Sequence, residues 1–147
     1  MYKRRVMGIG MAVLAALLLL SVPDDSVAGA HLVYERIGYQ SGVETVVDYF
    51  LANVAGDDRV NGRFADTDMA QLRGHLIDQV CEATDGPCTY KGKSMREAHA
   101  GMGITEAEFA IIAGHFAAAM EQAGVSSSDH ATIMGVLSAM QDDIVGR

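Results

Sequence analysis

Apolar side chains recur every three or four positions through four separate stretches of this chain, and this spacing limits its fold more than any other feature. On an α-helix, residues spaced in this way share one face, which has to be buried against another element. The stretches are marked by Val43, Val46, Val47, Phe50, Leu51 and Val54, by Met69, Leu72, Leu76, Val80 and Ala83, by Phe109, Ile112, Phe116 and Met120, and by Ile133, Leu137, Met140 and Ile144. No stretch reads as a β-strand, so we expect an all-α domain of four substantial helices joined by short pieces.

Capping residues predict where several of these helices begin. Ser94 is placed to cap a short helical turn, and Thr105 with Glu108 has the pattern of a capping box for the next long helix. We expect Ser128 or Asp129 to cap the last helix, because both precede its first apolar residues.

The composition limits what such a domain can bind. The 147 residues suit one domain, and half of them are apolar, which is enough to build a core. With 11 Lys and Arg against 19 Asp and Glu, the net charge is −8, so the chain lacks the basic surface that a phosphate backbone requires. We therefore expect no binding to nucleic acid.

The first thirty residues have the features of an export signal. Three basic residues at 3–5 precede an uncharged run over 6–22, and the small residues at 28–30 resemble a cleavage site. We therefore expect a signal peptide over 1–30 and a mature domain over 31–147, exported to the periplasm. The alternative is an uncleaved segment that anchors the domain to the inner membrane, which would be its only association with a membrane.

Two cysteines, Cys81 and Cys88, flank a turn that Asp85-Gly86-Pro87 predicts. In an oxidising compartment they can form a disulfide, and two free thiols are the alternative. Together with His75 and His99 they are also candidate zinc ligands, although their spacing is wider than a zinc site favours.

The five histidines differ in their sequence surroundings. His75 and His99 both adjoin apolar residues, which makes them the candidates for ligands. His31 is interpreted as a solvated residue at the start of the mature chain, His115 as a partly buried structural residue, and His130 as an exposed residue in a first helical turn.

Sequence motifs of common enzymes are missing from the chain. It has no G-x-S-x-G nucleophile motif, no phosphate-binding glycine loop and no H-E-x-x-H. The acidic pairs Asp57-Asp58 and Asp142-Asp143 lie near helix ends, where solvated carboxylates are the simpler interpretation. These observations leave open whether the protein is an enzyme.

Four sequence strings resemble the truncated haemoglobins, group I in particular. They are LVYERIG at 32–38, FADTDM at 64–69, REAHAGMGIT at 96–105 and AGHF at 113–116. The resemblance covers about residues 32–145, and the string around His99 is its most specific part. It implies a two-over-two helical sandwich that encloses haem b.

The resemblance also implies roles for single residues. His99 stands where the family places the proximal iron ligand, and Phe64 matches the phenylalanine that packs on the haem face. The positions that match pocket-lining residues are Met95, Ile104, Phe109 and Ile112. The candidates to pair with the haem propionates are Tyr90, Arg96 and Arg73.

The expected distal pocket departs from the family pattern. Leu51, next to Phe50, stands where group I members usually have a tyrosine, and Leu72 and Leu76 replace polar residues. A hydrogen bond to bound dioxygen contributes about 1.5–3 kcal/mol. We therefore expect weak retention of O₂ relative to CO and NO. A further departure is Gly38-Tyr39, where the family usually has two glycines.

His75 stands where cyanobacterial members of the family carry a histidine that closes onto the iron. We expect His75 and His99 to give a six-coordinate haem when no external ligand is bound. The alternative is that His75 swings outward to a propionate. Cyanobacterial members can also bind haem covalently through a histidine in the last helix. Here that neighbourhood reads Met140-Gln141-Asp142, so the haem should be extractable.

Four functions are compatible with these expectations. The first is reversible binding of diatomic gas ligands (O₂, CO or NO) for transport, storage or sensing. The second is nitric oxide or peroxide detoxification, which the missing distal tyrosine disfavours. The third is electron transfer between a bis-histidine haem and a redox partner. The fourth is a helical interaction domain that binds no haem and whose histidines are structural.

Overall fold

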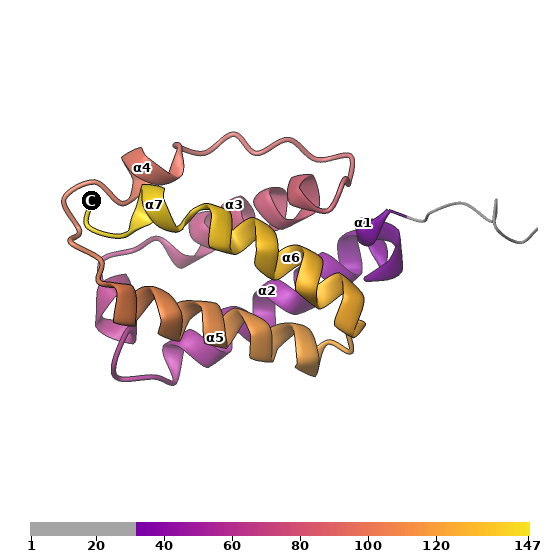
Figure 1. The fold of residues 1–147 in the computed structure, drawn as a ribbon, viewed down its shortest axis with the longest axis horizontal. Coiled ribbons are helices and arrows are strands. Elements are labelled where there is room, and N and C mark those ends of the chain that lie inside the picture. Colours follow the sequence, from indigo (N-terminus) through magenta and orange to yellow (C-terminus); the bar gives the residue numbers. More distant parts are fainter. Residues whose placement is uncertain (1–31) are drawn as a thin grey trace, which may run out of the picture. The chain divides into compact units, whose positions relative to one another are not determined.

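The computed structural model describes residues 32–147, and within that range the chain is helical and has no strand. Its helices, drawn in Figure 1, are α1 (Val33–Arg36), α2 (Tyr39–Ala55), the 3-10 helix η2 (Asn61–Phe64), α3 (Met69–Ala83), α4 (Met95–Ala98), α5 (Glu106–Gln122), α6 (Ser127–Ala139) and α7 (Gln141–Ile144). Four long helices with short pieces between them confirm the expectation from apolar spacing. The expected export signal and His31 lie outside the described residues. No helix within 32–147 combines the length and apolarity that crossing a bilayer requires.

Helix α2 forms the centre of the core. It packs against both α3 and α5, and α5 packs in turn against α6. The valine-rich face of α2 makes this possible, since Val43, Val46, Val47 and Val54 are each at most 1% exposed. Burial of one such side chain contributes about 1.5–3 kcal/mol. The face therefore holds α3 and α5 against α2.

Capping boxes set the starts of α4 and α5, as the sequence predicts. At α4, the Ser94 hydroxyl accepts a hydrogen bond from the Glu97 backbone, and the Glu97 carboxylate accepts one from the Ser94 backbone. Thr105 and Glu108 form the same reciprocal pair at α5. Each box satisfies backbone N–H groups that the first helical turn leaves unpaired.

Helix α6 begins earlier than the sequence indicated. Its cap is Ser126, whose hydroxyl accepts a hydrogen bond from the Asp129 backbone, so the prediction of Ser128 or Asp129 is wrong. The Asp129 carboxylate is buried and accepts a hydrogen bond from Nε of Arg36 at 2.9 Å. The Arg36 guanidinium holds the pKa of Asp129 below its usual range. This pair ties α1 to α6 across most of the described chain.

The turn between α1 and α2 explains how the chain accommodates a tyrosine in place of a second glycine. Gly38 and Tyr39 have φ of 101° and 59°, both in the left-handed region. This backbone conformation costs a non-glycine residue about 1–2 kcal/mol. The Tyr39 ring packs edge-on against Tyr34 with centroids 5.8 Å apart. Such an aromatic pair contributes about 0.5–1.5 kcal/mol, which offsets much of the cost.

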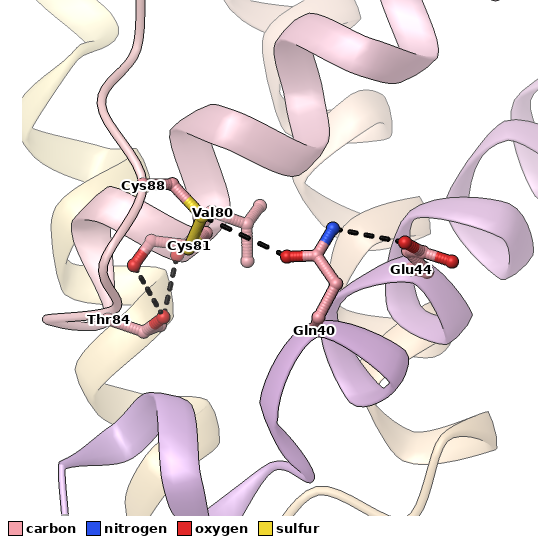
Figure 2. Close-up of a disulfide and its surroundings, with 6 residues drawn as sticks. All are labelled: Gln40, Glu44, Val80, Cys81, Thr84 and Cys88. Carbon is pink, nitrogen blue, oxygen red and sulfur yellow. Dashed lines mark hydrogen bonds between the residues drawn. A yellow bond between two sulfur atoms is a disulfide. The ribbon is translucent and has the colours of Figure 1, made fainter.

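Cys81 and Cys88 form a disulfide at the end of α3, with their Cα atoms 5.7 Å apart (Figure 2). The sequence did not decide between a disulfide and two free thiols, and the structure contains the disulfide. A Cβ at Gly86 would lie 2.6 Å from Cys81 Sγ, so only glycine fits this turn without movement. Sulfurs bonded to each other are not zinc ligands, and no group of three metal-binding side chains occurs within 32–147.

Candidate functional site

A cavity of about 340 Å³ lies between helices α3, α4, α5 and α6. This volume is within the range of small-molecule and cofactor sites. Most of its wall is apolar, formed by Phe50, Phe64, Leu72, Leu76, Val80, Ala83, Met95, Ala98, Met102, Ile112, Phe116, Ile133, Val136, Leu137, Met140 and Ile144. The polar side chains in its wall are Arg63, Thr67, His75, Gln79, Tyr90 and His99.

His99 lies directly after α4, and its imidazole is oriented by a backbone hydrogen bond. Its Nδ1 is 2.8 Å from the main-chain oxygen of Met95. A carbonyl oxygen only accepts hydrogen bonds, so Nδ1 carries the proton and Nε2 of the neutral ring keeps its lone pair. A fixed tautomer of this kind is how proteins prepare an imidazole to bind a metal. His99 therefore has the chemistry of an iron ligand.

Helix α3 supplies a second wall of the cavity. Leu72, His75 and Leu76 lie on one face of this helix and are half-buried. The His75 ring meets the Tyr90 ring edge-on, with centroids 5.9 Å apart and planes at 78°. The cavity thus has one imidazole from the middle of α3 and another from the end of α4.

Nine of the residues predicted for the site line this cavity. They are Phe50, Phe64, Leu72, His75, Leu76, Tyr90, Met95, His99 and Ile112. They come from several elements that are distant in sequence, and the fold brings them together. Helix α6 adds a further wall, formed by Ile133, Val136 and Leu137, of which the sequence had indicated Ile133 and Leu137 as core.

Three apolar residues predicted for the pocket lie outside it. Leu51 follows Phe50 on α2, about 100° further around the helix, and packs against the hydrophobic core instead. Phe109 is buried, but it lies one turn closer to the start of α5 than the lining residue Ile112. Ile104 lies in the loop before α5 and is half-buried away from the cavity. None of the three lines the cavity, and their contact with the cofactor stays a prediction.

The arginines expected to meet the haem propionates pair with carboxylates of the chain. Arg96 is exposed outside the cavity, and its Nη2 lies 2.7 Å from Asp143. Nε of Arg73 lies 2.6 Å from Asp48. Arg96 does not line the cavity, and its pairing with a haem propionate stays a prediction.

Arg63 is the arginine that does line the cavity, and the sequence analysis missed it. It donates hydrogen bonds at 2.8 Å to Glu108 and to the main-chain oxygen of Met102. Hydrogen bonds from Thr105, together with this one, hold the pKa of the Glu108 carboxyl below its usual range. No local pattern signals this role, because both partners of Arg63 are distant in sequence.

Gln79 is a second polar lining residue that the sequence analysis missed. Its Nε2 lies 3.4 Å from Met95 Sδ and 3.5 Å from Met140 Sδ, and thioether sulfur is a weak acceptor. Gln79 follows His75 by four positions, which places the two about 40° apart on one face of α3. That spacing could have revealed it. The cavity therefore contains an amide in addition to the imidazoles of His75 and His99.

Two other histidines lie outside the cavity. His115 is partly buried, as predicted, and its Nε2 is 2.7 Å from Asp57. Asp57 also accepts hydrogen bonds from Arg59, and the two partners hold its pKa well below its usual range. Asp57 is thus part of a structural ion pair rather than simply solvated. His130 was expected to be exposed and is half-buried.

Comparison with known proteins extends this description. The model of the bacterial-like globin family matches residues 32–145. The chain belongs to the bacterial-like globin family. Its relatives include the group 1 truncated hemoglobin of Mycolicibacterium paratuberculosis, which is 36% identical over 112 residues, 76% of this chain and 82% of that protein. The group 1 truncated hemoglobin of Nostoc sp. is 34% identical over 115 residues, 78% of this chain and 98% of that protein.

Solved structures confirm the expected globin fold. Truncated hemoglobin from Tetrahymena pyriformis in its Fe(III) form aligns with a TM-score of 0.75 at 30% identity, covering 79% of this chain and 99% of that one. The 2/2 hemoglobin of Synechococcus sp. PCC 7002, in the cyanomet state and with covalently attached heme, aligns with a TM-score of 0.73, at the same identity and coverage. The two-over-two architecture predicted from the sequence is therefore the architecture of this globin.

Haem is the cofactor of this globin, and the residues of the cavity fit it. The wall is apolar over most of its area, which suits a porphyrin, and His99 offers a nitrogen lone pair for the iron. Arg63 and Tyr90 are the cation and the phenol of the wall that could meet carboxylate groups of the cofactor.

Proposed function

We propose that this globin is exported and binds diatomic gases at its haem, and that His75 and His99 both hold the iron when no external ligand is present. The observation that supports this most directly is that these two histidines line one apolar cavity, while the other described histidines do not. They come from different helices, so neither depends on the other for its position.

The two imidazoles have different parts in this proposal. His99 is the permanent ligand, because its proton is fixed on Nδ1 by the Met95 carbonyl and its backbone is fixed by α4. His75 is the exchangeable ligand, because it projects from the face of α3 and no hydrogen bond restrains its ring. The haem supplies an iron that accepts one gas molecule. His75 lowers the apparent gas affinity by the fraction of molecules in which it occupies that position.

Export is supported by the disulfide. Bonds between cysteines persist in oxidising compartments and are rare where thiols are kept reduced. Together with the signal-like residues 1–30, this favours the periplasm over the cytoplasm. The alternative is that the N-terminal segment remains as an anchor in the inner membrane. Fractionation of cells that express the full chain distinguishes these outcomes, since a cytoplasmic pool of full length would contradict export.

Electron transfer is the second candidate function, and the same pair of histidines favours it. A haem held by two imidazoles needs no open position to exchange electrons with a redox partner. The two functions differ in how readily His75 leaves the iron. Fast and complete binding of CO to the ferrous protein supports gas binding, whereas a closed state that resists CO favours electron transfer.

Absorption spectra of protein purified from cells expressing the full chain test the proposal. We expect low-spin six-coordinate spectra for the ferric and ferrous forms. His75→Ala should convert both to forms with an open or water-filled position. His115→Ala is the matched control, since that histidine is also half-buried but lies outside the cavity. A high-spin ferric spectrum that His75→Ala leaves unchanged would contradict the assignment of His75.

A further inference from the structure

We propose that Tyr90 is a positioning residue for His75 and that the Cys81–Cys88 disulfide holds Tyr90 in place. The redox state of the disulfide then sets how often His75 closes the cavity. The inference rests on the proposed function, because it concerns the route by which His75 reaches the iron.

The first step is the contact between the two rings. Tyr90 and His75 are half-buried, line the same cavity and meet edge-on, with centroids 5.9 Å apart. Edge-to-face pairs are a favoured arrangement for aromatic rings. A side chain that is already ordered loses less conformational entropy when it binds. Tyr90 therefore prepares His75 for ligation by restricting the positions that its ring samples.

The second step is what fixes Tyr90 itself. Its hydroxyl donates a hydrogen bond of 2.8 Å to the main-chain oxygen of Lys93. A Cβ at Gly92 would lie 2.3 Å from the Tyr90 hydroxyl oxygen, so the ring occupies space that only glycine leaves open. The hydrogen bond to Lys93 and the packing against Gly92 thus hold the Tyr90 ring in one position.

The third step concerns the segment that carries Tyr90. Residues 87–93, all of which the structure describes, form no hydrogen bonds between main-chain groups. Cys88, two positions before Tyr90, joins this segment covalently to Cys81 on α3, the helix that also carries His75 (Figure 2). The disulfide therefore fixes the distance between the segment and the helix, and so the place of Tyr90 beside His75.

Reduction of the bond removes this constraint. A dithiol reductant transfers two electrons to the Cys81–Cys88 bond, which breaks, and each sulfur takes up one proton. The reductant becomes a cyclic disulfide. The segment over 87–93 then keeps its peptide connections and its side-chain packing, including that of Cys88 against the core, but loses its covalent link to α3. The Tyr90 ring is therefore less confined. We expect the closed state with His75 on the iron to be less populated after reduction.

The experiment compares the share of molecules that have His75 on the iron. It uses ferrous protein under anaerobic conditions, so that the reductant does not change the oxidation state of the iron. Absorption spectra give the ratio of closed molecules, in which His75 is on the iron, to open molecules, in which it is not. Tyr90→Leu should lower this ratio about two- to tenfold, the effect expected from loss of an aromatic pair. Gly92→Ala should act in the same direction by displacing the ring. Tyr90→Phe keeps the ring and should retain more of the closed state than Tyr90→Leu.

The effect of the reductant on the wild type and on Tyr90→Leu tests whether the disulfide acts through Tyr90. Dithiothreitol should lower the ratio in the wild type and have no further effect in Tyr90→Leu, because the two changes act through one contact. The pair of substitutions Cys81→Ser and Cys88→Ser should reproduce the reduced state, with circular dichroism confirming that the helices remain. Equal responses of wild type and Tyr90→Leu to the reductant would overturn the inference, as would an unchanged ratio in Tyr90→Leu.

A second measurement separates this inference from the proposed function. Nuclear Overhauser effects between the Tyr90 and His75 rings, recorded in the diamagnetic ferrous protein under CO, report the contact when His75 is off the iron. We expect them in the oxidised protein and expect reduction to weaken them. If they are present while His75→Ala leaves the spectra unchanged, the proposed ligation fails and the positioning contact stands. If they are missing, the inference fails even where His75 binds iron.

Discussion

Among the single residues, His99 is the one on which we expect retention of the cofactor to depend most. We expect His99→Ala to release haem more than about tenfold faster than the wild type, since the remaining wall offers mainly apolar contacts. Transfer of haem to a scavenging apoglobin measures this rate. His115→Ala is the control, and added imidazole should restore part of the loss by filling the space. Retention of haem by His99→Ala at the wild-type rate would remove the basis of the proposed function.

Single residues differ in how far the sequence reveals them. The role proposed for His99 comes from the sequence, because the string around it is specific and its apolar neighbours are local. Arg63 could not, because its carboxylate and carbonyl partners lie 45 and 39 positions away. Gln79 lies between these cases. Its position on the face of His75 follows from helical geometry, but its methionine neighbours come from α4 and from the junction between α6 and α7.

Among the elements, α1 depends on α6 through the Arg36–Asp129 pair. We expect Asp129→Asn to lower the free energy of unfolding by about 1–2 kcal/mol at neutral pH, because a charge-assisted hydrogen bond is lost. The pKa of Asp129 is lowered in the folded state, so its contribution is present above the unfolded pKa of about 4 and is lost as pH falls through the folded pKa. Urea unfolding of both proteins between neutral and acid pH measures this.

The variant and the wild type should therefore differ most at neutral pH and converge in acid. Asp143→Asn is the matched control, since Asp143 pairs with Arg96 at an exposed position, where ion pairs contribute little. A stability difference for Asp129→Asn that stays constant down to strongly acid pH would show that the charge of Asp129 is not what stabilises the contact.

At the scale of the whole molecule, the disulfide stabilises the fold by restricting the unfolded chain. Cys81 and Cys88 close a short loop, for which chain entropy predicts about 2–3 kcal/mol. We expect the double substitution Cys81→Ser and Cys88→Ser to lose this amount in urea unfolding. Adding a thiol reductant to the wild type should cause the same loss and should not affect the double variant. An equal stability of oxidised and reduced wild type would contradict this.

The sequence by itself determined the helical class, the approximate position of the long helices and the histidines that could bind a cofactor. These properties depend on spacing within single helices and on the specific string around His99, and both are local. Capping boxes at Ser94 and Thr105 are local for the same reason, since each joins residues three positions apart.

Only the tertiary structure decided which side of each helix faces the cavity. Phe50 lines it and Leu51 does not, although both are apolar and adjacent, because the packing of α2 sets its rotation. The contact of Tyr90 with His75 and the partners of Arg63 and Arg96 depend equally on contacts between segments. Such contacts form only when distant parts of the chain meet, and no local pattern encodes their geometry.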